Sequence, residues 1–266
     1  ATGMAHGEAY LRNIFTNSST KSSGLVDHFT YVLASDGDLQ EPVTLGSASL
    51  AGHLGLSKLI VFYDANEAQI SGNTNRSDST DYKKIFDGFN WHVQEINGHD
   101  HAEIKESIES AQKDSRPSII IGNTIMAKGT ATMEGDHNTH GAPLPQDEID
   151  ATKVKLGIKS ESFLLPEEVI TYFRSDFQSQ TNKVKSWNNK LILMQQNLDF
   201  KTFWTVTIEN NLPRLEMPEF EIGASLATRK AFGATLDSFS KSLPNMIGGS
   251  ADLEPSNYTG NFAKNY

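Results

Sequence analysis

Long apolar runs, each followed by a polar turn, divide the first half of the chain. They cover residues 29–35, 58–64 and 116–125. Runs of this length without a polar face predict strands buried inside a parallel sheet. Residues 89–96 alternate between apolar and polar positions, which predicts a fourth strand.

Stretches with helical spacing of apolar residues lie before and between these runs. They cover residues 3–15, 42–54, 78–86 and 101–114. Pro42 is typical of a first helical turn, and Gly55 is expected to follow the end of that helix in a left-handed conformation. Alternating strands and helices favour right-handed crossovers, so we expect an α/β fold with a parallel sheet.

The second half of the chain is less regular. Residues 127–145 contain glycines, histidines and prolines but few apolar positions, which predicts a long irregular loop. We expect helices that begin at Pro145 and at Pro166, the second reaching about residue 196. The remaining predicted elements are a connector over 197–222, a helix over 225–243 and a strand over 245–250.

Two of the predicted strands end in residues that suit a divalent cation. Asp36 and Gly37 follow the first run, and Asn66 follows the second. Neighbouring parallel strands bring their carboxyl ends to one edge of the sheet, where ligands bind in open α/β folds. A carboxylate and an amide oxygen suit Mg²⁺ or Ca²⁺, and Gly37 lets a phosphate approach the backbone. Taken alone, the Asp-Gly pair is more often a turn.

The composition narrows the range of partners. The 266 residues carry a formal net charge of −10 and include no cysteine. The charge argues against binding to nucleic acid, and the lack of cysteine excludes disulfides and thiolate catalysis. No apolar run is long enough to cross a membrane, and the first residues lack the layout of a signal peptide. We therefore expect a cytoplasmic protein of one large or two small domains.

A series of short motifs, in order along the chain, resembles those of transketolases. The motifs are SDGDLQE at 35–41, SLAGH at 49–53, KLIVFYD at 58–64 with Asn66, NGHD at 97–100, THGAPL at 139–144, SLATRK at 225–230 and GGSADLEPS at 248–256. This resemblance implies an incomplete diphosphate-binding domain of the thiamine-diphosphate-binding fold over residues 1–196. A linker over 197–222 and the start of a pyrimidine-binding domain over 223–266 would follow.

The resemblance also implies roles at the predicted cation site. Asp36, Asn66 and the backbone carbonyl of Ala68 would hold Mg²⁺ or Ca²⁺. Gly37 and His140 would lie against the diphosphate of thiamine diphosphate, and His140 would also face the substrate as a catalytic residue. Without the motif around it, a histidine in this glycine- and proline-rich loop would more often be structural.

Further roles follow from the resemblance in the last third of the chain and at Glu41. Arg229 would bind the sugar phosphate, with Ser256 as a second phosphate contact. Asp252 and Leu253 would be cofactor contacts, Asp252 near the thiazolium of a cofactor held mainly by the other subunit. Glu41 would join a catalytic carboxylate network at the dimer interface. Taken singly, Arg229 is a solvated helix charge, Asp252 a turn residue and Glu41 a helix cap.

Some positions depart from the family pattern or stay without a role. Ser35 and Pro42 stand where glycine is usual, Gly46 where a second glutamate is usual, and Ala65 where an acidic residue is common. The expected metal ligands survive these changes, whereas the carboxylate network loses the usual partner of Glu41. His137 and Tyr258 are candidate pocket residues without an assigned role.

A transketolase moves a two-carbon ketol unit from a ketose phosphate to an aldose phosphate, with the cofactor as electron sink. The resemblance implies thiamine diphosphate with Mg²⁺ or Ca²⁺, sugar phosphates, and a homodimer or a complementary transketolase half as partner. We expect the chain alone to be inactive, because the family's amino-terminal segment and the glutamate of its pyrimidine-binding domain lie outside this sequence.

Other functions stay open at this point. The chain could be a non-catalytic transketolase-like protein that binds or regulates a full-length copy, or a relative that uses a different ketol substrate. A dehydrogenase of the Rossmann type is disfavoured, because no G-x-G-x-x-G motif follows a predicted strand.

Overall fold

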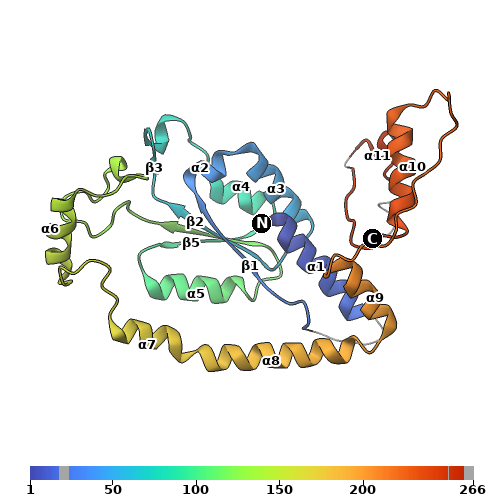
Figure 1. Cartoon of the computed structure of the whole chain (residues 1–266). Coiled ribbons are helices and arrows are strands. Elements are labelled where there is room, and N and C mark those ends of the chain that lie inside the picture. The colour runs from blue at the N-terminus through green and yellow to red at the C-terminus, as the bar shows by residue number, and fades with distance from the viewer. Residues whose placement is uncertain (18–23, 251, 261–266) are drawn as a thin grey trace. The chain divides into compact units, whose positions relative to one another are not determined.

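The computed structural model describes residues 1–17, 24–250 and 252–260 (Figure 1). The described residues divide into two compact units. Unit 1 runs to Gln180 and unit 2 begins at Thr181. The predicted boundaries at residues 196 and 222 stay predictions.

A parallel four-stranded sheet forms the centre of unit 1. Its strands, in spatial order, are β1 (Thr30–Ser35), β2 (Leu59–Ala65), β6 (Ser118–Asn123) and β5 (His92–Asn97). All three strand pairings are parallel. The expected α/β fold with a parallel sheet is therefore confirmed, and the two most apolar runs form its central strands.

Helices cover both faces of this sheet (Figure 1). On one face the core takes side chains from α1 (Thr2–Asn17), α3 (Pro42–His53) and α4 (Tyr82–Gly88). On the other face, α5 (His101–Ala111) packs against β5 and β6. Successive residues of a strand point to opposite faces, so Ile60 joins the core under α5 while Val61 joins the larger core.

Small residues allow α3 to pack very closely. Ala48, Ala51 and Gly52 are its buried positions. The indole N–H of Trp91 donates to the carbonyl oxygen of Ala48 at 2.8 Å. A Cβ atom on Gly52 would lie 1.8 Å from the carbonyl oxygen of Phe89, so no larger residue fits there.

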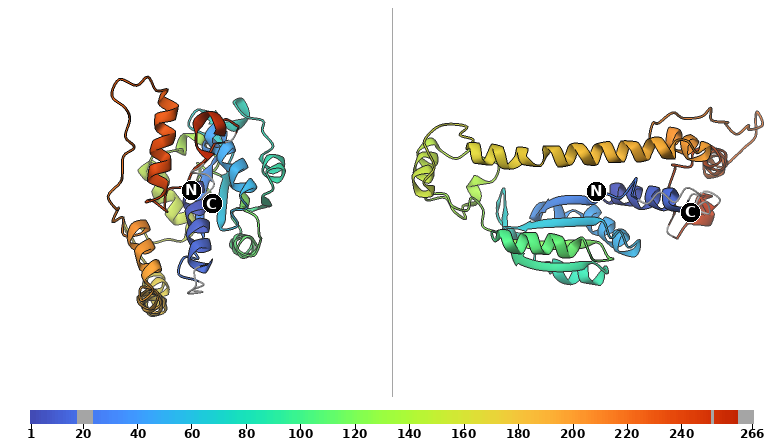
Figure 2. Two further views of the ribbon diagram at one scale, coloured as in Figure 1. Left: turned by 90° about the vertical axis from the view of Figure 1, so that its right-hand side faces the viewer. Right: turned by 90° about the horizontal axis from the view of Figure 1, so that it is seen from below.

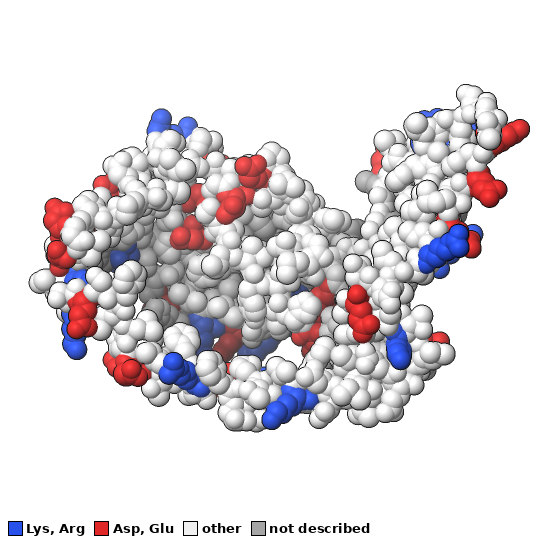
Figure 3. Space-filling model, in the orientation of Figure 1, with Lys and Arg blue, Asp and Glu red and all other residues white. Residues whose placement is uncertain are grey.

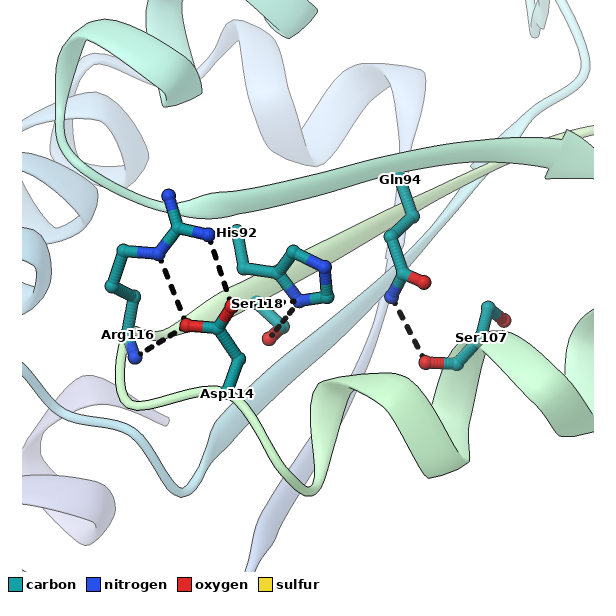
Figure 4. Close-up of polar contacts among 6 residues, drawn as sticks. All are labelled: His92, Gln94, Ser107, Asp114, Arg116 and Ser118. Atoms are coloured by element: carbon teal, nitrogen blue, oxygen red, sulfur yellow. Dashed lines mark hydrogen bonds and ion pairs between the residues drawn. The ribbon is translucent and has the colours of Figure 1, made fainter.

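A polar cluster closes the amino-terminal edge of the sheet, opposite the edge where the predicted cation site lies (Figure 4). Asp114, in the turn before β6, accepts two bonds from the guanidinium of Arg116, from Nε at 3.0 Å and from Nη2 at 2.9 Å. His92 Nδ1 lies 3.2 Å from the buried Ser118 Oγ and 3.8 Å from Asp114. Because serine and aspartate face the same ring nitrogen, this is a structural contact and no catalytic triad.

We expect Arg116→Ala to raise the pKa of Asp114 from about 2 toward its usual 3.8, because the guanidinium is the main cause of the lowering. A carboxyl group with a lowered pKa stabilises the fold above its usual pKa, and the effect is lost as the pH falls from about 4 through about 2. The variant should lose at most about 1 kcal/mol near neutral pH and nothing near pH 1. NMR titration of Asp114 and urea unfolding at both pH values measure this.

The matched control is Lys105→Ala, which removes an exposed pair with Glu109 on α5. It should leave the pKa of Asp114 unchanged. A stability difference for Arg116→Ala that persists undiminished near pH 1 would contradict the assignment to this ion pair.

Short elements interrupt the two loops that follow β2 and β6. Residues 67–78 contain a small hairpin of β3 (Ala68–Gln69) and β4 (Gly72–Asn73), followed by the 3₁₀ turn η1 (Thr74–Arg76). The loop over 127–145 is irregular as expected, apart from the 3₁₀ turn η2 (His137–Thr139), and α6 (Gln146–Leu156) follows it.

The single helix predicted from Pro166 to residue 196 is wrong. The structure has α7 (Glu167–Ser175) and α8 (Phe177–Met194), with a break at Asp176 that Figure 2 shows. The Ser175 hydroxyl donates to the carbonyl oxygen of Tyr172 at 2.6 Å, and the Asp176 carboxylate accepts from the side chain of Gln180. Side chains that bond locally in this way compete with the helix backbone, which accounts for the break.

The connector predicted over residues 197–222 contains a helix, α9 (Leu198–Thr207). Asn197 caps it by accepting the backbone N–H of Phe200 at 2.9 Å. Phe200 stacks on Trp204 within the same helix, with 5.7 Å between the ring centroids. A connector was predicted because of the prolines later in this stretch, although the Asn197 cap and the aromatic pair favour a helix.

The last predicted elements are partly correct. A helix forms within 225–243 as α10 (Thr228–Ser240), and α11 (Glu254–Asn257) lies against it. The strand predicted over residues 245–250 is wrong, because these residues form no strand. Among the described residues of unit 2 there is no strand to pair with, so an extended segment there has no ladder of hydrogen bonds.

The distribution of charged side chains on the surface agrees with the negative net charge of the sequence. On the face drawn in Figure 3, blue and red side chains are interspersed among uncharged residues, and the described residues form no continuous basic area there. Within the described parts of the chain, none of the helices has the length and apolar character needed to cross a membrane.

Candidate functional site

The carboxyl ends of β1 and β2 bring the predicted cation ligands to one place. The parallel register pairs Ser35 with Asp64, so Asp36 and Asn66 each lie just beyond this pair. The backbone N–H of Asn66 is near enough to the Asp36 carboxylate to be one of the smaller influences that lower its pKa. The short helix α2 (Asp36–Gln40) contacts both β2 and the hairpin strand that carries Ala68.

Asp36 has a buried carboxylate, and one of its two oxygens has no hydrogen-bond partner among the described residues. The residue is 6% exposed, and Oδ1 accepts the hydroxyl of Tyr63 at 2.6 Å. Oδ2 is buried and has no hydrogen-bond partner among the described residues. Burial raises the pKa of Asp36, and the nearby Asp64 charge adds to the rise, while the Tyr63 hydroxyl opposes it. A bound cation would offset both the cost of burying the charged carboxylate and its repulsion by Asp64.

A chain of hydrogen bonds fixes Asn66. Its amide nitrogen donates to Asp64 Oδ2 at 3.1 Å, and its Oδ1 accepts the backbone N–H of Ala68 at 3.0 Å. The other carboxylate oxygen of Asp64 accepts the hydroxyl of Thr124, beyond the end of β6. An amide oxygen has two lone pairs, so Oδ1 can accept this bond and still face a cation.

The turn between β1 and α2 leaves the backbone open at Gly37. A Cβ atom there would have no neighbour within 4 Å. Asp38 accepts the backbone N–H and the hydroxyl of Ser35, at 2.8 and 2.9 Å, which holds the first turn of α2 in place. Glu41 is the N-cap residue of α3, as its local reading predicted, but its exposed side chain makes no capping hydrogen bond.

The hairpin after Asn66 contains an unfavourable backbone conformation. Glu67 has a φ angle of 56°, in the left-handed region that few residues other than glycine and asparagine adopt. Its carbonyl oxygen accepts the backbone N–H of Thr74 at 3.1 Å, which closes the hairpin. The conformation places Ala68 directly beside α2.

We expect Glu67→Gly to raise the free energy of unfolding by about 1 kcal/mol, because glycine adopts the left-handed conformation without steric conflict. Urea unfolding monitored by circular dichroism measures the change. Asn90→Gly is the matched control, since Asn90 has a φ angle of 65° but asparagine tolerates it, and it should gain less than half as much. Equal gains at both positions, or a loss at Glu67, would contradict this explanation.

The loop that carries His140 is anchored on both sides. Its turn η2 contacts β4 of the hairpin. Farther back, Glu148 of α6 accepts the backbone N–H and the hydroxyl of Thr132, at 2.8 and 2.6 Å, and these bonds are the main cause of its lowered pKa. The side chains of His140 and His137 are exposed. The structure thus brings the His140 loop next to the hairpin that carries Ala68.

Two hollows border this edge of the sheet. One, of about 660 Å³, is lined by Asp38, Asp64, Asn66, His99 and Lys128 among others. The other, of about 410 Å³, is lined by residues that include Asp36, Tyr63, Asp78 and Tyr82. Asp36 and Asn66 therefore border different hollows, although they lie side by side in the turns.

The remaining predicted site residues belong to unit 2. Arg229, near the start of α10, is exposed, as are Asp252 and Leu253, which precede α11. Ser256 is exposed on α11, which contacts α10, so the two predicted phosphate contacts lie on neighbouring helices. Tyr258 packs on α10, since a Cβ atom on Gly233 would lie 2.4 Å from its Cβ atom.

Four residues that support the site, without being candidate ligands, were not predicted from the sequence. They are Tyr63, Asp64, Thr124 and Glu148. The signal for Tyr63 and Asp64 was present, because a tyrosine and an aspartate at the end of a buried strand need polar partners. Thr124 and Glu148 gave no such signal, because their partners are distant in sequence.

Comparisons with known proteins agree with this geometry. The family model described as "Transketolase, thiamine diphosphate binding domain" matches residues 1–213. The chain is 36% identical to a transketolase of Halalkalibacterium halodurans over 265 residues and 37% identical to transketolase 2 of Escherichia coli over 271 residues. These alignments cover 97% of this chain but 39% and 40% of the relatives.

The chain belongs to the transketolase family. Solved transketolases from Leishmania mexicana and Campylobacter jejuni match the fold with TM-scores of 0.88 and 0.81, at 30% and 32% identity. They cover 99% and 97% of this chain, which in turn covers 40% of each. The matched domain is a thiamine-diphosphate-binding domain, so the expected family is confirmed and thiamine diphosphate is supported as the cofactor.

The residues at this edge fit a divalent cation bound with the cofactor. Asp36 Oδ2, which has no partner among the described residues, would supply a charged oxygen, and the Asn66 amide and the Ala68 carbonyl would supply neutral ones. The described residues contain no group of three or more histidine, cysteine or acidic side chains around a common point. Diphosphate oxygens and water would therefore complete the shell of a hard cation, as Mg²⁺ prefers.

Proposed function

We propose that this chain forms the diphosphate and Mg²⁺ site of a transketolase, which transfers a two-carbon ketol unit from a ketose phosphate to an aldose phosphate. The observation that carries the proposal is the unpartnered Oδ2 of Asp36, buried at the carboxyl edge of the sheet in a member of this family. Leaving a charged oxygen without a partner is unfavourable unless a ligand completes the site.

The proposed division of roles follows the chemistry of each group. Asp36, the Asn66 amide oxygen and the Ala68 carbonyl would hold Mg²⁺, while the open backbone at Gly37 lets phosphate oxygens approach. His140 would donate to the diphosphate and face the substrate as a catalytic residue. When bound, thiamine diphosphate supplies the electron sink for breaking and forming the carbon–carbon bond.

Sugar phosphates are the proposed substrates. A transketolase of Pichia stipitis, 30% identical to this chain, was solved in complex with fructose 6-phosphate. In unit 2, Arg229 and Ser256 would bind such a phosphate, and Asp252 and Leu253 would contact the cofactor. Glu41 would lie at an interface between two subunits of a cytoplasmic dimer. A non-catalytic role gains no support from the comparisons, because the relatives named above are transketolases.

The proposal predicts that the isolated chain has no measurable transketolase turnover, because the sequence covers about 40% of its relatives. A steady-state assay with a ketose phosphate donor and an aldose phosphate acceptor tests this. Adding the remaining part of a related transketolase should restore turnover, and the same mixture made with Asp36→Ala should stay inactive. Turnover of the isolated chain at the rate of a complete transketolase would contradict the proposal.

A further inference from the structure

The Asp36–Tyr63 hydrogen bond joins two buried residues beside the proposed metal site. Tyr63 is the fifth residue of β2 and is 6% exposed, as is Asp36 at the start of α2. The Tyr63 hydroxyl donates to Asp36 Oδ1 at 2.6 Å, a length typical of a strong bond to a charged acceptor. The bond therefore holds one of the two carboxylate oxygens.

The same bond determines which oxygen is left for a ligand. A carboxylate is free to rotate about its last side-chain bond, and its two oxygens are chemically equivalent. With Oδ1 accepting the hydroxyl, Oδ2 is the carboxylate oxygen that has no partner in the part of the chain that the structure describes. The carboxylate is thus prepared to bind a cation through a single oxygen.

Tyr63 itself cannot easily turn away. It belongs to the larger core of unit 1, and its strand neighbours are Ala34 on β1 and Ile121 on β6. Its ring packs edge-on against Tyr82, with 5.9 Å between centroids and 76° between the ring planes. The hydroxyl therefore has a fixed position, as a group that orients a metal ligand requires.

The neighbouring ring provides a natural comparison. The Tyr82 hydroxyl donates to Asp78 Oδ2 at 2.7 Å and thus has a carboxylate partner of its own. All four residues line the same hollow, of about 410 Å³. The two tyrosines are alike in burial and packing, and only Tyr63 contacts a proposed metal ligand.

We propose that Tyr63 is a positioning residue that makes Asp36 a one-oxygen ligand and thereby favours Mg²⁺ over Ca²⁺. This inference rests on the proposed function, in which Asp36 binds the cation. Mg²⁺ requires a nearly ideal octahedron of single oxygens, whereas Ca²⁺ readily takes both oxygens of a carboxylate. Without the hydroxyl, both oxygens of Asp36 become available, which suits Ca²⁺ better than Mg²⁺.

The test compares Tyr63→Phe with Tyr82→Phe, each of which removes one hydroxyl from the same aromatic pair. Thiamine diphosphate is titrated into each protein by calorimetry over a range of Mg²⁺ or Ca²⁺ concentrations. Tyr63→Phe should require at least about 10-fold more Mg²⁺ for half-maximal binding, with the Ca²⁺ requirement changed less than about threefold. Tyr82→Phe should leave both requirements unchanged.

Each outcome has a separate meaning. Thermal unfolding checks that both variants keep the fold of the unchanged chain. In a folded Tyr63→Phe variant, a Mg²⁺ requirement that stays within twofold of the unchanged chain, or an equal change for Ca²⁺, would overturn the positioning role alone. Failure of the unchanged chain to show any metal dependence would overturn the proposed function and the inference that rests on it.

Discussion

Replacing Asp36 with alanine should weaken the Mg²⁺-dependent binding of thiamine diphosphate by on the order of 100-fold or more. The variant removes the buried Oδ2, which is the only charged oxygen that the proposed ligand set contributes. Neutral oxygens from Asn66 and Ala68 attract a divalent cation far less strongly than a carboxylate does in a buried site. Calorimetric titration of thiamine diphosphate at saturating Mg²⁺ measures the effect.

Asp78→Ala is the matched control for this experiment. It removes the same charge from the same hollow, but Asp78 pairs with Tyr82 and lies outside the proposed ligand set. Its effect should be less than about threefold, because a charge that acts at a distance through water contributes little. Equal losses in both variants would show that general charge, and not ligation by Asp36, determines binding.

The second large effect concerns the close packing of the last turn of α3 against Phe89. Gly52→Ala should destabilise the fold by about 3 kcal/mol or more, because the new Cβ atom would overlap the carbonyl oxygen of Phe89 at 1.8 Å. Backbone atoms cannot move aside as a flexible side chain can, so α3 would have to shift away from the sheet. Urea or thermal unfolding measures the loss.

Gly46→Ala, on the same helix, should change the stability of the fold in the opposite direction. A Cβ atom there meets nothing within 4 Å, and the position is exposed. Alanine is about 1 kcal/mol more favourable than glycine inside a helix, so this variant should gain stability. If both variants changed stability in the same direction, the close approach of Gly52 to Phe89 would not be the reason.

The strands of unit 1 could be predicted because their signal is local. Buried runs such as Leu59–Ala65 and Ser118–Asn123 have no polar face, and each is separated from the next by a helical stretch. This alternation is sufficient for a parallel sheet. Beyond unit 1, the helix cap at Asn197 was present in the sequence but was outweighed by the prolines that follow.

The elements that were predicted wrongly depend on neighbouring strands or side-chain contacts that the sequence does not reveal. A strand at residues 245–250 needs a neighbour, and the described residues of unit 2 offer none. The break at Asp176 depends on how Ser175 and Asp176 place their side chains. Local preference alone cannot decide between such alternatives.

The same distinction holds at the candidate site. Asp36 and Asn66 could be predicted from their places after two strands, and the structure brings them together. The supporting bonds join residues that are 27 positions apart for Tyr63 and Asp36, and 60 apart for Thr124 and Asp64. Only the register of the sheet makes these pairs neighbours, so their contribution required the structure.

The measurement that tests the central claim most directly is calorimetric titration of thiamine diphosphate into the unchanged chain, with and without Mg²⁺. The account predicts saturable binding with Mg²⁺ that is lost when the metal is chelated, because the carboxylate of Asp36 and the diphosphate are brought together by the cation. Binding of equal strength without metal, or no binding in its presence, would contradict the claim that this chain holds the diphosphate through a divalent cation at the carboxyl edge of its sheet.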